Sequence, residues 1–133
     1  MPLTRIDVTD AISSARLSAL ADALHQAAVE TIGITPDNRH QIIGVHPAGQ
    51  IIVDQDFMNL DRGREQVIVQ ITLRRGRSDQ AKRDLYARIA ELAAAKAGID
   101  PRNILISLVE TEGADWSFGS GRAQLLDAAS TTA

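Results

Sequence analysis

The sequence contains no cysteine, few aromatic residues and no long apolar run. Without cysteine, the chain has no disulfide, no thiolate nucleophile and no thiolate metal site, and we expect a cytoplasmic location. No segment approaches the length of a transmembrane helix, and we expect no signal peptide at the N-terminus. A formal net charge of -3 argues against nucleic acid or an anionic membrane as the main partner.

The length and composition suit a single globular domain. The chain has 133 residues, of which 44% are hydrophobic and 23% are charged, which is enough for one packed core. We therefore treat residues 1–133 as one domain.

The chain contains an internal repeat at an offset of about 65 residues, and such a repeat governs the prediction of the fold. The segment Gly33-Ile34-Thr35-Pro36-Asp37-Asn38 recurs as Gly98-Ile99-Asp100-Pro101-Arg102-Asn103. Each glycine stands where a helix end favours a left-handed residue, and the proline that follows prevents the helix from continuing. The repeated units cover about residues 2–47 and 66–112.

Each unit reads as strand, helix, strand, because leucines and alanines recur at helical spacing between two apolar runs. We predict helices at about 13–32 and 78–97, and strands at 2–8, 41–45, 67–73 and 104–110. The fold class is therefore α/β (α+β): two tandem βαβ units that form a four-stranded sheet, with the first strand beside the third. Because βαβ crossovers are right-handed, both helices should cover the same face.

The other face of this sheet needs a cover. The strand at 67–73 is apolar on both sides, which is typical of a strand buried on both faces. Self-association is the simplest source of that cover. Between the two units, Gln50-Ile51-Ile52-Val53-Asp54 predicts a further short strand, followed by an acidic loop.

The run Leu73-Arg74-Arg75-Gly76-Arg77-Ser78 ends one predicted strand and begins a helix. Ligands of α/β folds bind at such junctions, where Ser78 can cap the helix and free N–H groups favour an anion. Arginine side chains there suit a carboxylate. A solvated basic turn is the alternative interpretation.

Two of the four aromatic residues, Trp116 and Phe118, lie in a glycine-containing loop after the last predicted strand. They could line a small apolar pocket or fill a subunit interface, and a site at an interface would use them for both.

Proline is the second residue, and it begins the first predicted strand, where it removes no hydrogen bond from the sheet. If Met1 is trimmed, Pro2 carries a secondary amine that can act as a base, an acid or a nucleophile. The first strand lies beside the third, so this amine should lie near the arginines of the 73–78 run. The three histidines show no metal-ligand spacing, although His40 or His46 could reach a pocket.

These features together resemble the tautomerase superfamily, and within it the malonate semialdehyde decarboxylases. The resemblance runs from Pro2 to about Leu126, and its most specific segments are Pro2-Leu3, Arg39-x-Gln41, Arg75-Gly76-Arg77-Ser78 and Asp115-Trp116-Ser117-Phe118-Gly119-x-Gly121-Arg122-Ala123. It implies a homotrimer of tandem βαβ chains with the sheets facing inward. It also implies that Pro2 carries the chemistry, that Arg75 and Arg77 bind a substrate carboxylate, and that Trp116 and Phe118 line the pocket. The sequence itself contains no motif for a cofactor or a metal, and we expect neither.

One residue departs from the decarboxylase pattern. That family has a catalytic aspartate immediately before the arginine of its motif, and here Asn38 occupies the place before Arg39. Asp37 lies one residue earlier, where an extended chain would point its side chain the other way. Nearby arginines lower the pKa of an amine and a nearby carboxylate raises it, so the loss of the carboxylate favours a neutral Pro2 and proton abstraction.

Three functions are therefore considered. The first is a proline-based keto–enol tautomerase of a small 2-oxo or 3-oxo acid, in which Asn38 hydrogen-bonds the substrate oxygen. The second is a malonate semialdehyde decarboxylase-like lyase or hydratase that uses the same pocket. The third is a non-catalytic trimeric scaffold of the same fold.

Overall fold

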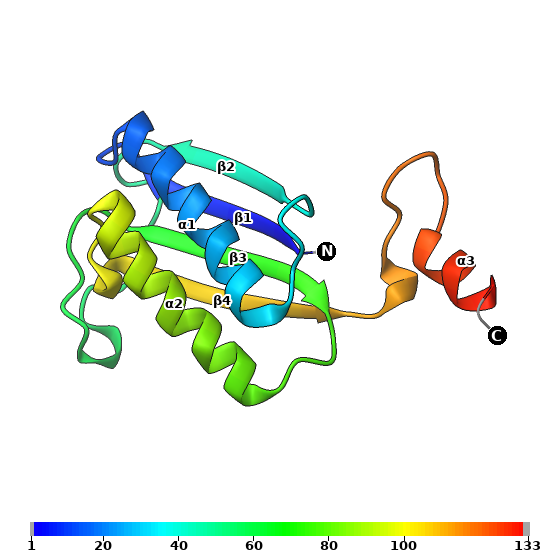
Figure 1. Cartoon of the computed structure of the whole chain (residues 1–133). Helices are drawn as coiled ribbons and strands as arrows, with labels where there is room; N and C mark the ends of the chain where they lie inside the picture. Colours follow the sequence, from blue (N-terminus) through cyan, green and yellow to red (C-terminus); the bar gives the residue numbers. More distant parts are fainter. Residues whose placement is uncertain (1, 132–133) are drawn as a thin grey trace.

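The computed structural model describes residues 2–131, with side chains to residue 128. Its elements follow one another as two strand–helix–strand units and a final helix (Figure 1). They are β1 (Leu3–Thr9), α1 (Ser14–Ile32), β2 (His40–His46), β3 (Val67–Arg74), α2 (Asp79–Ala97), β4 (Ile104–Thr111) and α3 (Gln124–Thr131), with short 3-10 turns at Phe57–Asn59, Pro101–Asn103 and Gly113–Asp115. The predicted helices and the four main strands are thus confirmed.

The four strands form one sheet in the order β2-β1-β3-β4. Pairing is parallel inside each βαβ unit and antiparallel between β1 and β3. Leu3 pairs with His40 on one side and with Thr72 on the other, so the start of β1 lies between the start of β2 and the end of β3. The prediction that the first strand lies beside the third is confirmed.

The helix ends show why these segments fold as predicted. The Ser13 and Ser78 hydroxyls accept hydrogen bonds from the backbone N–H groups of Arg16 and Ala81, and so cap α1 and α2. At the other ends, Gly33 and Gly98 adopt the left-handed conformation, with φ of 73° and 62°. A glycine takes this conformation without steric cost, which explains why the repeat keeps it at both positions.

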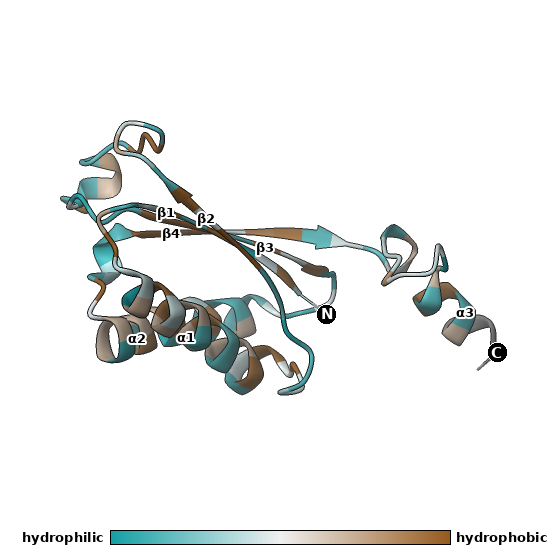
Figure 2. Ribbon diagram, turned by 90° about the horizontal axis from the view of Figure 1, so that it is seen from above, coloured by the Kyte–Doolittle hydropathy of each residue, from teal (hydrophilic) through white to brown (hydrophobic). Residues whose placement is uncertain are grey.

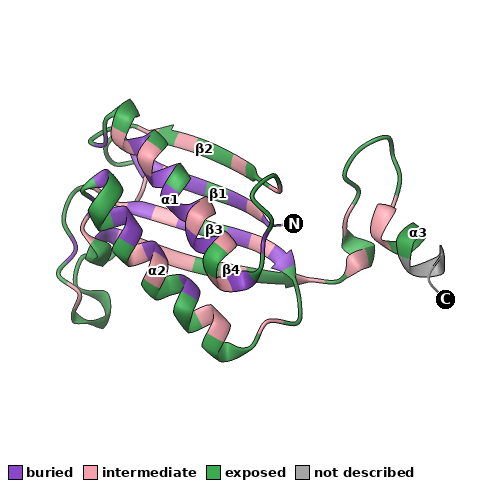
Figure 3. Ribbon diagram, in the orientation of Figure 1, coloured by how far each residue is buried: buried purple, intermediate pink, exposed green. Residues whose placement is uncertain are grey.

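Both helices lie on one face of the sheet, as Figure 2 shows, and the hydrophobic core fills the space between the helices and the sheet. Alternate residues of β1 and β3 enter this core and are fully or almost fully buried (Figure 3), namely Ile6, Val8, Val67, Val69, Ile71 and Leu73. Leu20 and Leu24 of α1, with Leu85 and Ile89 of α2, pack against them.

The opposite face of the sheet has no helix over it. Its apolar side chains include Ile42 and Val109, which are 44% and 39% exposed. An ionic cluster lies on the same face, where Arg5 and His46 both contact the Asp7 carboxylate. This face is the surface for which the sequence predicted a cover.

Beyond β4, the chain continues as an arm, which we define as residues 112–131. The arm extends away from the sheet and the two large helices, and α3 packs against the turn Gly113–Asp115 (Figure 1). One prediction was wrong: Gln50–Asp54 forms no strand. Its apolar residues have no strand to pair with, and Ile52 is 90% exposed.

Candidate active site

Pro2 is buried at the start of β1 and lines a cavity of about 250 Å³, which we call the Pro2 cavity. The other lining residues are Leu3, His40, Trp116, Ser117 and Phe118. The cavity is therefore formed between the N-terminal ends of β1 and β2 and the beginning of the arm. Pockets for drug-sized ligands have volumes of about 300–1,000 Å³, so this cavity suits a small molecule.

The two aromatic rings are fixed by the end of β4. Nε1 of Trp116 donates to Oγ1 of Thr111 at 2.7 Å, and that hydroxyl in turn donates to the Leu73 carbonyl at 2.9 Å. The rings of Trp116 and Phe118 stack, with their centroids 5.7 Å apart and an interplanar angle of 23°. The structure thus brings Pro2, Trp116 and Phe118 together in one cavity.

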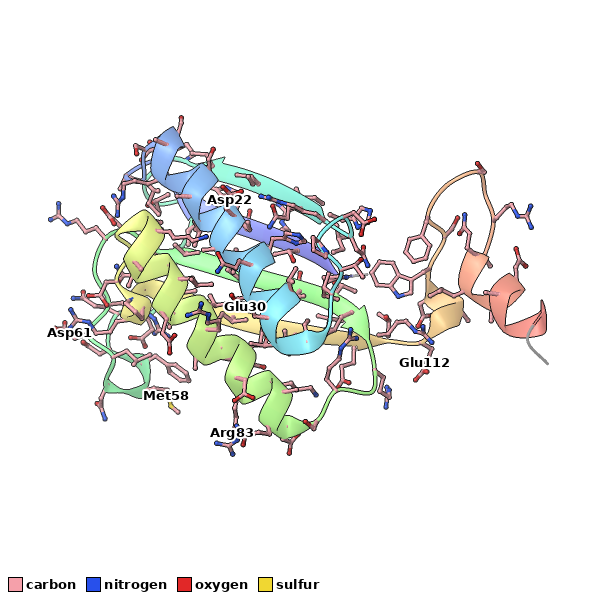
Figure 4. All side chains as sticks on the ribbon, in the orientation of Figure 1. Asp22, Glu30, Met58, Asp61, Arg83 and Glu112 are labelled. Carbon is pink, nitrogen blue, oxygen red and sulfur yellow. The ribbon has the colours of Figure 1, made fainter. Side chains whose placement is uncertain are left out.

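Arg74, Arg75, Gly76 and Arg77 line a second cavity, of about 350 Å³, which we call the arginine cavity. It lies at the same end of the sheet, because the antiparallel register places the residue before Leu3 beside Leu73. Arg75 pairs with Glu112 at the base of the arm, with Nε 3.0 Å from Oε1 (Figure 4). Both side chains are about two-thirds exposed, so the pair contributes about 1 kcal/mol or less and can open for another carboxylate.

Arg77 binds backbone rather than an acidic side chain. It donates to the carbonyls of Arg74 at 3.0 Å and Ile32 at 3.3 Å, and so satisfies a carbonyl at the C-terminus of α1. Arg16 does the same for the other helix, through the carbonyls of Ala97 and Gly98. Arg77 therefore has a role in holding the two repeats together, besides any role towards a ligand.

Asn38 lies in the turn before β2, where its backbone N–H donates to the Thr35 carbonyl at 3.0 Å. It is not among the residues that line either cavity. The Arg39 and Gln41 side chains that follow it are bound to α1, through Asp22 and the Ala21 carbonyl (Figure 4 labels Asp22). The structure therefore does not bring Asn38 to the wall of the Pro2 cavity.

Sequence reasoning left one contributor to this region undecided and missed another. Either His40 or His46 was expected to be able to reach a pocket, and the structure places His40 in the lining of the Pro2 cavity. Thr111 was not noted, although its hydroxyl holds Trp116. The parallel register of β1 and β2 decides the position of His40, and no single-sequence pattern reports a register.

A third cavity, of about 400 Å³, lies at the opposite end of the sheet and includes Thr9, Asp10, Ile51 and Gln66 among its lining residues. The repeat relates this end to the arginine cavity, with Thr9 and Asp10 in the places of Arg74 and Arg75. Val67 takes the place of Pro2 there, and its nitrogen is a peptide amide without basicity. Proline and the paired arginines Arg74 and Arg75 of the Pro2 end thus have no counterparts in the repeat-related positions of the other end.

The described residues contain no group of three or more histidine or acidic side chains placed to hold a metal ion. Nor is any helix within residues 2–131 both long and apolar enough to cross a membrane.

Comparison with known proteins supports an enzyme of one family. Residues 38–119 match one family model described as "Tautomerase enzyme", and residues 2–58 match a second model with the same description. "Probable tautomerase YrdN" of Bacillus subtilis (strain 168) is 32% identical over 126 residues, which span 95% of this chain and 97% of the relative.

Solved structures give the same result. The FG41 malonate semialdehyde decarboxylase inhibited by 3-bromopropiolate is 33% identical, with a TM-score of 0.89 and 96% of each chain covered. A second malonate semialdehyde decarboxylase, solved in wild-type, mutant and inactivated forms, is 29% identical, with a TM-score of 0.88 over 96% of this chain and 98% of the other. A fused 4-OT solved as a symmetric trimer is 22% identical over 93% of this chain and 98% of the other, and its TM-score of 0.75 shows a shared fold.

Proposed function

Because the chain belongs to the tautomerase family, we propose that it is a keto–enol tautomerase of a small oxo acid, with the Pro2 amine as its acid–base group. One observation carries the proposal: Pro2 is buried and lines a small cavity whose lining also includes the stacked residues Trp116 and Phe118.

In the proposed reaction, Arg75 and Arg77 hold the substrate carboxylate. Arg75 exchanges its exposed partner Glu112 for the substrate, and Arg77 contributes positive charge from the base of α2. The neutral Pro2 amine removes the proton from the carbon next to the carbonyl, and the same arginines stabilise the enolate charge as it develops. In the reverse reaction, Pro2 takes the proton from the enol oxygen and returns it to the carbon.

The identity of residue 38 favours tautomerisation over decarboxylation. An acidic side chain near the amine would raise its pKa and keep it protonated, which suits decarboxylation and the addition of water. Asn38 has no charge, so the arginines act on the amine without that opposition, and the neutral base is more populated at neutral pH. In this proposal Asn38 approaches the substrate oxygen when the turn before β2 closes on the ligand.

A second candidate function is a decarboxylase or hydratase of a small 3-oxo or unsaturated acid. It is favoured by the two malonate semialdehyde decarboxylases, which share 33% and 29% identity with this chain over almost its whole length. Both candidates use the same cavity and the same amine, and they differ in the charge that the amine carries.

The proposal includes a homotrimer. Its support is the uncovered sheet face, where Ile42 and Val109 are exposed in the single chain, and the trimer described for the fused 4-OT. Packing three such faces together would remove these side chains from water.

The test is a panel assay of the purified protein on phenylpyruvate, in its enol and keto forms, and on malonate semialdehyde. Mass spectrometry of the same sample first verifies that Met1, which lies outside the described residues, has been removed. We expect turnover of the enol and its loss in Pro2→Ala. Faster turnover of malonate semialdehyde would establish the second candidate, and a processed protein that is inactive on both substrates would leave the non-catalytic scaffold.

A further inference from the structure

His40 is a second ionisable group at the proposed site. Of the described residues that line the Pro2 cavity, His40 alone has an imidazole, a side chain that can both donate and accept a proton. It is the first residue of β2 and is exposed in the single chain, so its ring can exchange protons with water.

The neighbours of His40 fix the direction of its side chain. Nε of Arg39 donates to Oε1 of Gln41 at 2.8 Å, and Nε2 of Gln41 donates to the Ala21 carbonyl at 2.8 Å. A guanidinium nitrogen of Arg39 also lies 2.9 Å from the Asp22 carboxylate. Residues 39 and 41 are therefore both tied to α1. Side chains alternate along a strand, so His40 points to the other side of the sheet.

The register then brings His40 close to the amine. His40 pairs with Leu3 across the parallel β1–β2 ladder, and Pro2 immediately precedes Leu3. Adjacent strands lie about 4.8 Å apart, and a histidine ring can cross that distance. Trp116, Ser117 and Phe118 line the same cavity as both residues.

Tautomerisation moves a proton between an oxygen and a carbon of the substrate. A single base has to serve both atoms in turn, whereas two groups can serve one atom each. Residue 38 is an asparagine, whose amide does not exchange a proton with a substrate, and it does not line the Pro2 cavity. Among the described residues of that cavity, His40 is the side chain that can serve as the second group.

Building on the proposed function, we propose that His40 is the acid–base group for the substrate oxygen, while Pro2 serves the carbon. In enolisation, the neutral Pro2 nitrogen takes a proton from the carbon, and that C–H electron pair becomes the new C=C bond. The carbonyl π pair moves to oxygen, which takes a proton from the His40 imidazolium. Pro2 ends as the cation and His40 as the neutral ring, and both return to their starting forms by exchange with water.

Two arginines near His40 are already paired with carboxylates. On the open face of the sheet, Arg5 of the neighbouring strand β1 pairs with Asp7 at 2.8 Å. On the helix face, Arg39 is paired with Asp22. Within the cavity, Pro2 is the other residue with an acid–base group in this proposal. Pro2 and His40 therefore form a pair, with Pro2 as the base and His40 as the acid.

The experiment follows the exchange of the two α-hydrogens of phenylpyruvate with D2O by proton NMR, from pH 5 to 9. With increasing pH, the wild-type exchange rate should rise along an acid limb as Pro2 loses its proton. It should then fall along a basic limb as His40 loses its proton. His40→Gln can form hydrogen bonds but has no charge to lose, so we expect a fall in rate of about 100-fold and the loss of the basic limb. Ser117→Ala is the matched control, because it alters the same cavity without removing an ionisable group, and it should keep both limbs.

A binding measurement covers the case in which His40→Gln is misfolded. Trimethylpyruvate is a 2-oxo acid without an α-hydrogen, and it should shift the ring signals of His40 but not those of His25 in the wild-type protein. The assignment of His40 is overturned if His40→Gln keeps both limbs and a rate within about threefold of wild type, or if trimethylpyruvate quenches Trp116 without moving the His40 signals. A wild-type rate in Pro2→Ala would instead overturn the proposed function, and the role of His40 with it.

Discussion

Nε2 of His46 lies 2.6 Å from Oδ1 of Asp7, on the sheet face that the helices leave uncovered. Arg5 donates to both carboxylate oxygens of Asp7, from Nε at 2.8 Å and from a terminal nitrogen at 3.2 Å. Burial raises the pKa of the Asp7 carboxyl, but the hydrogen bonds from His46 and Arg5 outweigh burial and leave this pKa below its ordinary value. The cluster therefore links the stability of the fold to pH.

The first prediction concerns acid stability. The pKa of Asp7 is lower in the folded than in the unfolded chain, so its stabilisation is complete above about pH 4 and is lost as the pH falls through the folded-state value. Asp7→Asn should lower the free energy of unfolding by about 1–3 kcal/mol at pH 7, and by progressively less below pH 4. Urea unfolding at fixed protein concentration measures this, with the exposed Asp10→Asn as the control. Parallel pH dependences of wild type and Asp7→Asn would contradict it.

The second prediction concerns Gly44, which lies beside this cluster. A Cβ atom at Gly44 would lie 2.6 Å from Oδ1 of Asp7 and 3.1 Å from Nε2 of His46. Because Oδ1 of Asp7 and Nε2 of His46 are in contact with each other, neither atom can move away from the new Cβ without breaking that contact. Gly44→Ala should therefore cost about 1–3 kcal/mol of stability. In an Asp7→Ala background the obstruction is gone, and the same change should cost much less. Additive costs in this double-mutant cycle would show that the cluster does not restrict position 44.

The sequence predicted the frame of the molecule because the repeat specifies it locally. Neighbouring residues along the chain determine the helix caps, the helix ends and the apolar strands. The structure confirms the cap at Ser78, the helix ends at Gly33 and Gly98, and the strands. Gln50–Asp54 failed because an apolar run forms a strand only where a partner strand is present. The Arg77 contact with Ile32 joins residues 45 positions apart, which no local pattern reports. Whether Pro2, Asn38, Arg75 and Arg77 act together on a ligand stays a prediction.

The third prediction separates the two arginines. Arg75→Ala removes an exposed guanidinium, so it should raise the KM for the oxo acid by about 10- to 100-fold, as the loss of one charge-assisted hydrogen bond would. The free energy of unfolding should hardly change. Arg77→Ala should raise KM and also lower the stability, because it leaves the Ile32 carbonyl without its donor.

Steady-state kinetics and urea unfolding of the two variants test this, with Arg83→Ala on the surface of α2 as the control (Figure 4). Equal losses of stability in Arg75→Ala and Arg77→Ala would refute the distinction.

The fourth prediction uses the only tryptophan of the chain. Thr111→Val removes the acceptor of the Trp116 Nε1–H and the donor to the Leu73 carbonyl. The ring should lose its fixed orientation, so its fluorescence should shift to longer wavelength and the KM for the oxo acid should rise, with kcat changed less. Thr31→Val is the matched control, because Thr31 also donates to a carbonyl, but within α1. An unchanged emission maximum in Thr111→Val would show that the hydrogen bond does not hold the ring.

The last prediction concerns the reaction that the site performs. Asn38→Asp adds a carboxylate next to Arg39, at the position where the family's decarboxylases have theirs. A negative charge near the Pro2 amine favours its cation, so the pKa of the amine should rise and the acid limb of the tautomerase profile should move to higher pH. The rate of tautomerisation of the enol at neutral pH should fall, because less of the amine is neutral. The rate of decarboxylation of malonate semialdehyde should increase relative to the rate of tautomerisation.

Nitrogen-15 titration of the labelled amine measures the pKa directly, and Asn38→Ser controls for the loss of the amide. Because Asn38 does not line the Pro2 cavity in the free protein, the charge can act only if the turn before β2 approaches the amine. A pKa of Pro2 that is the same in Asn38→Asp and in wild type, with and without a bound oxo acid, would mean that position 38 does not select between the two reactions. The choice would then rest with groups that already line the cavity.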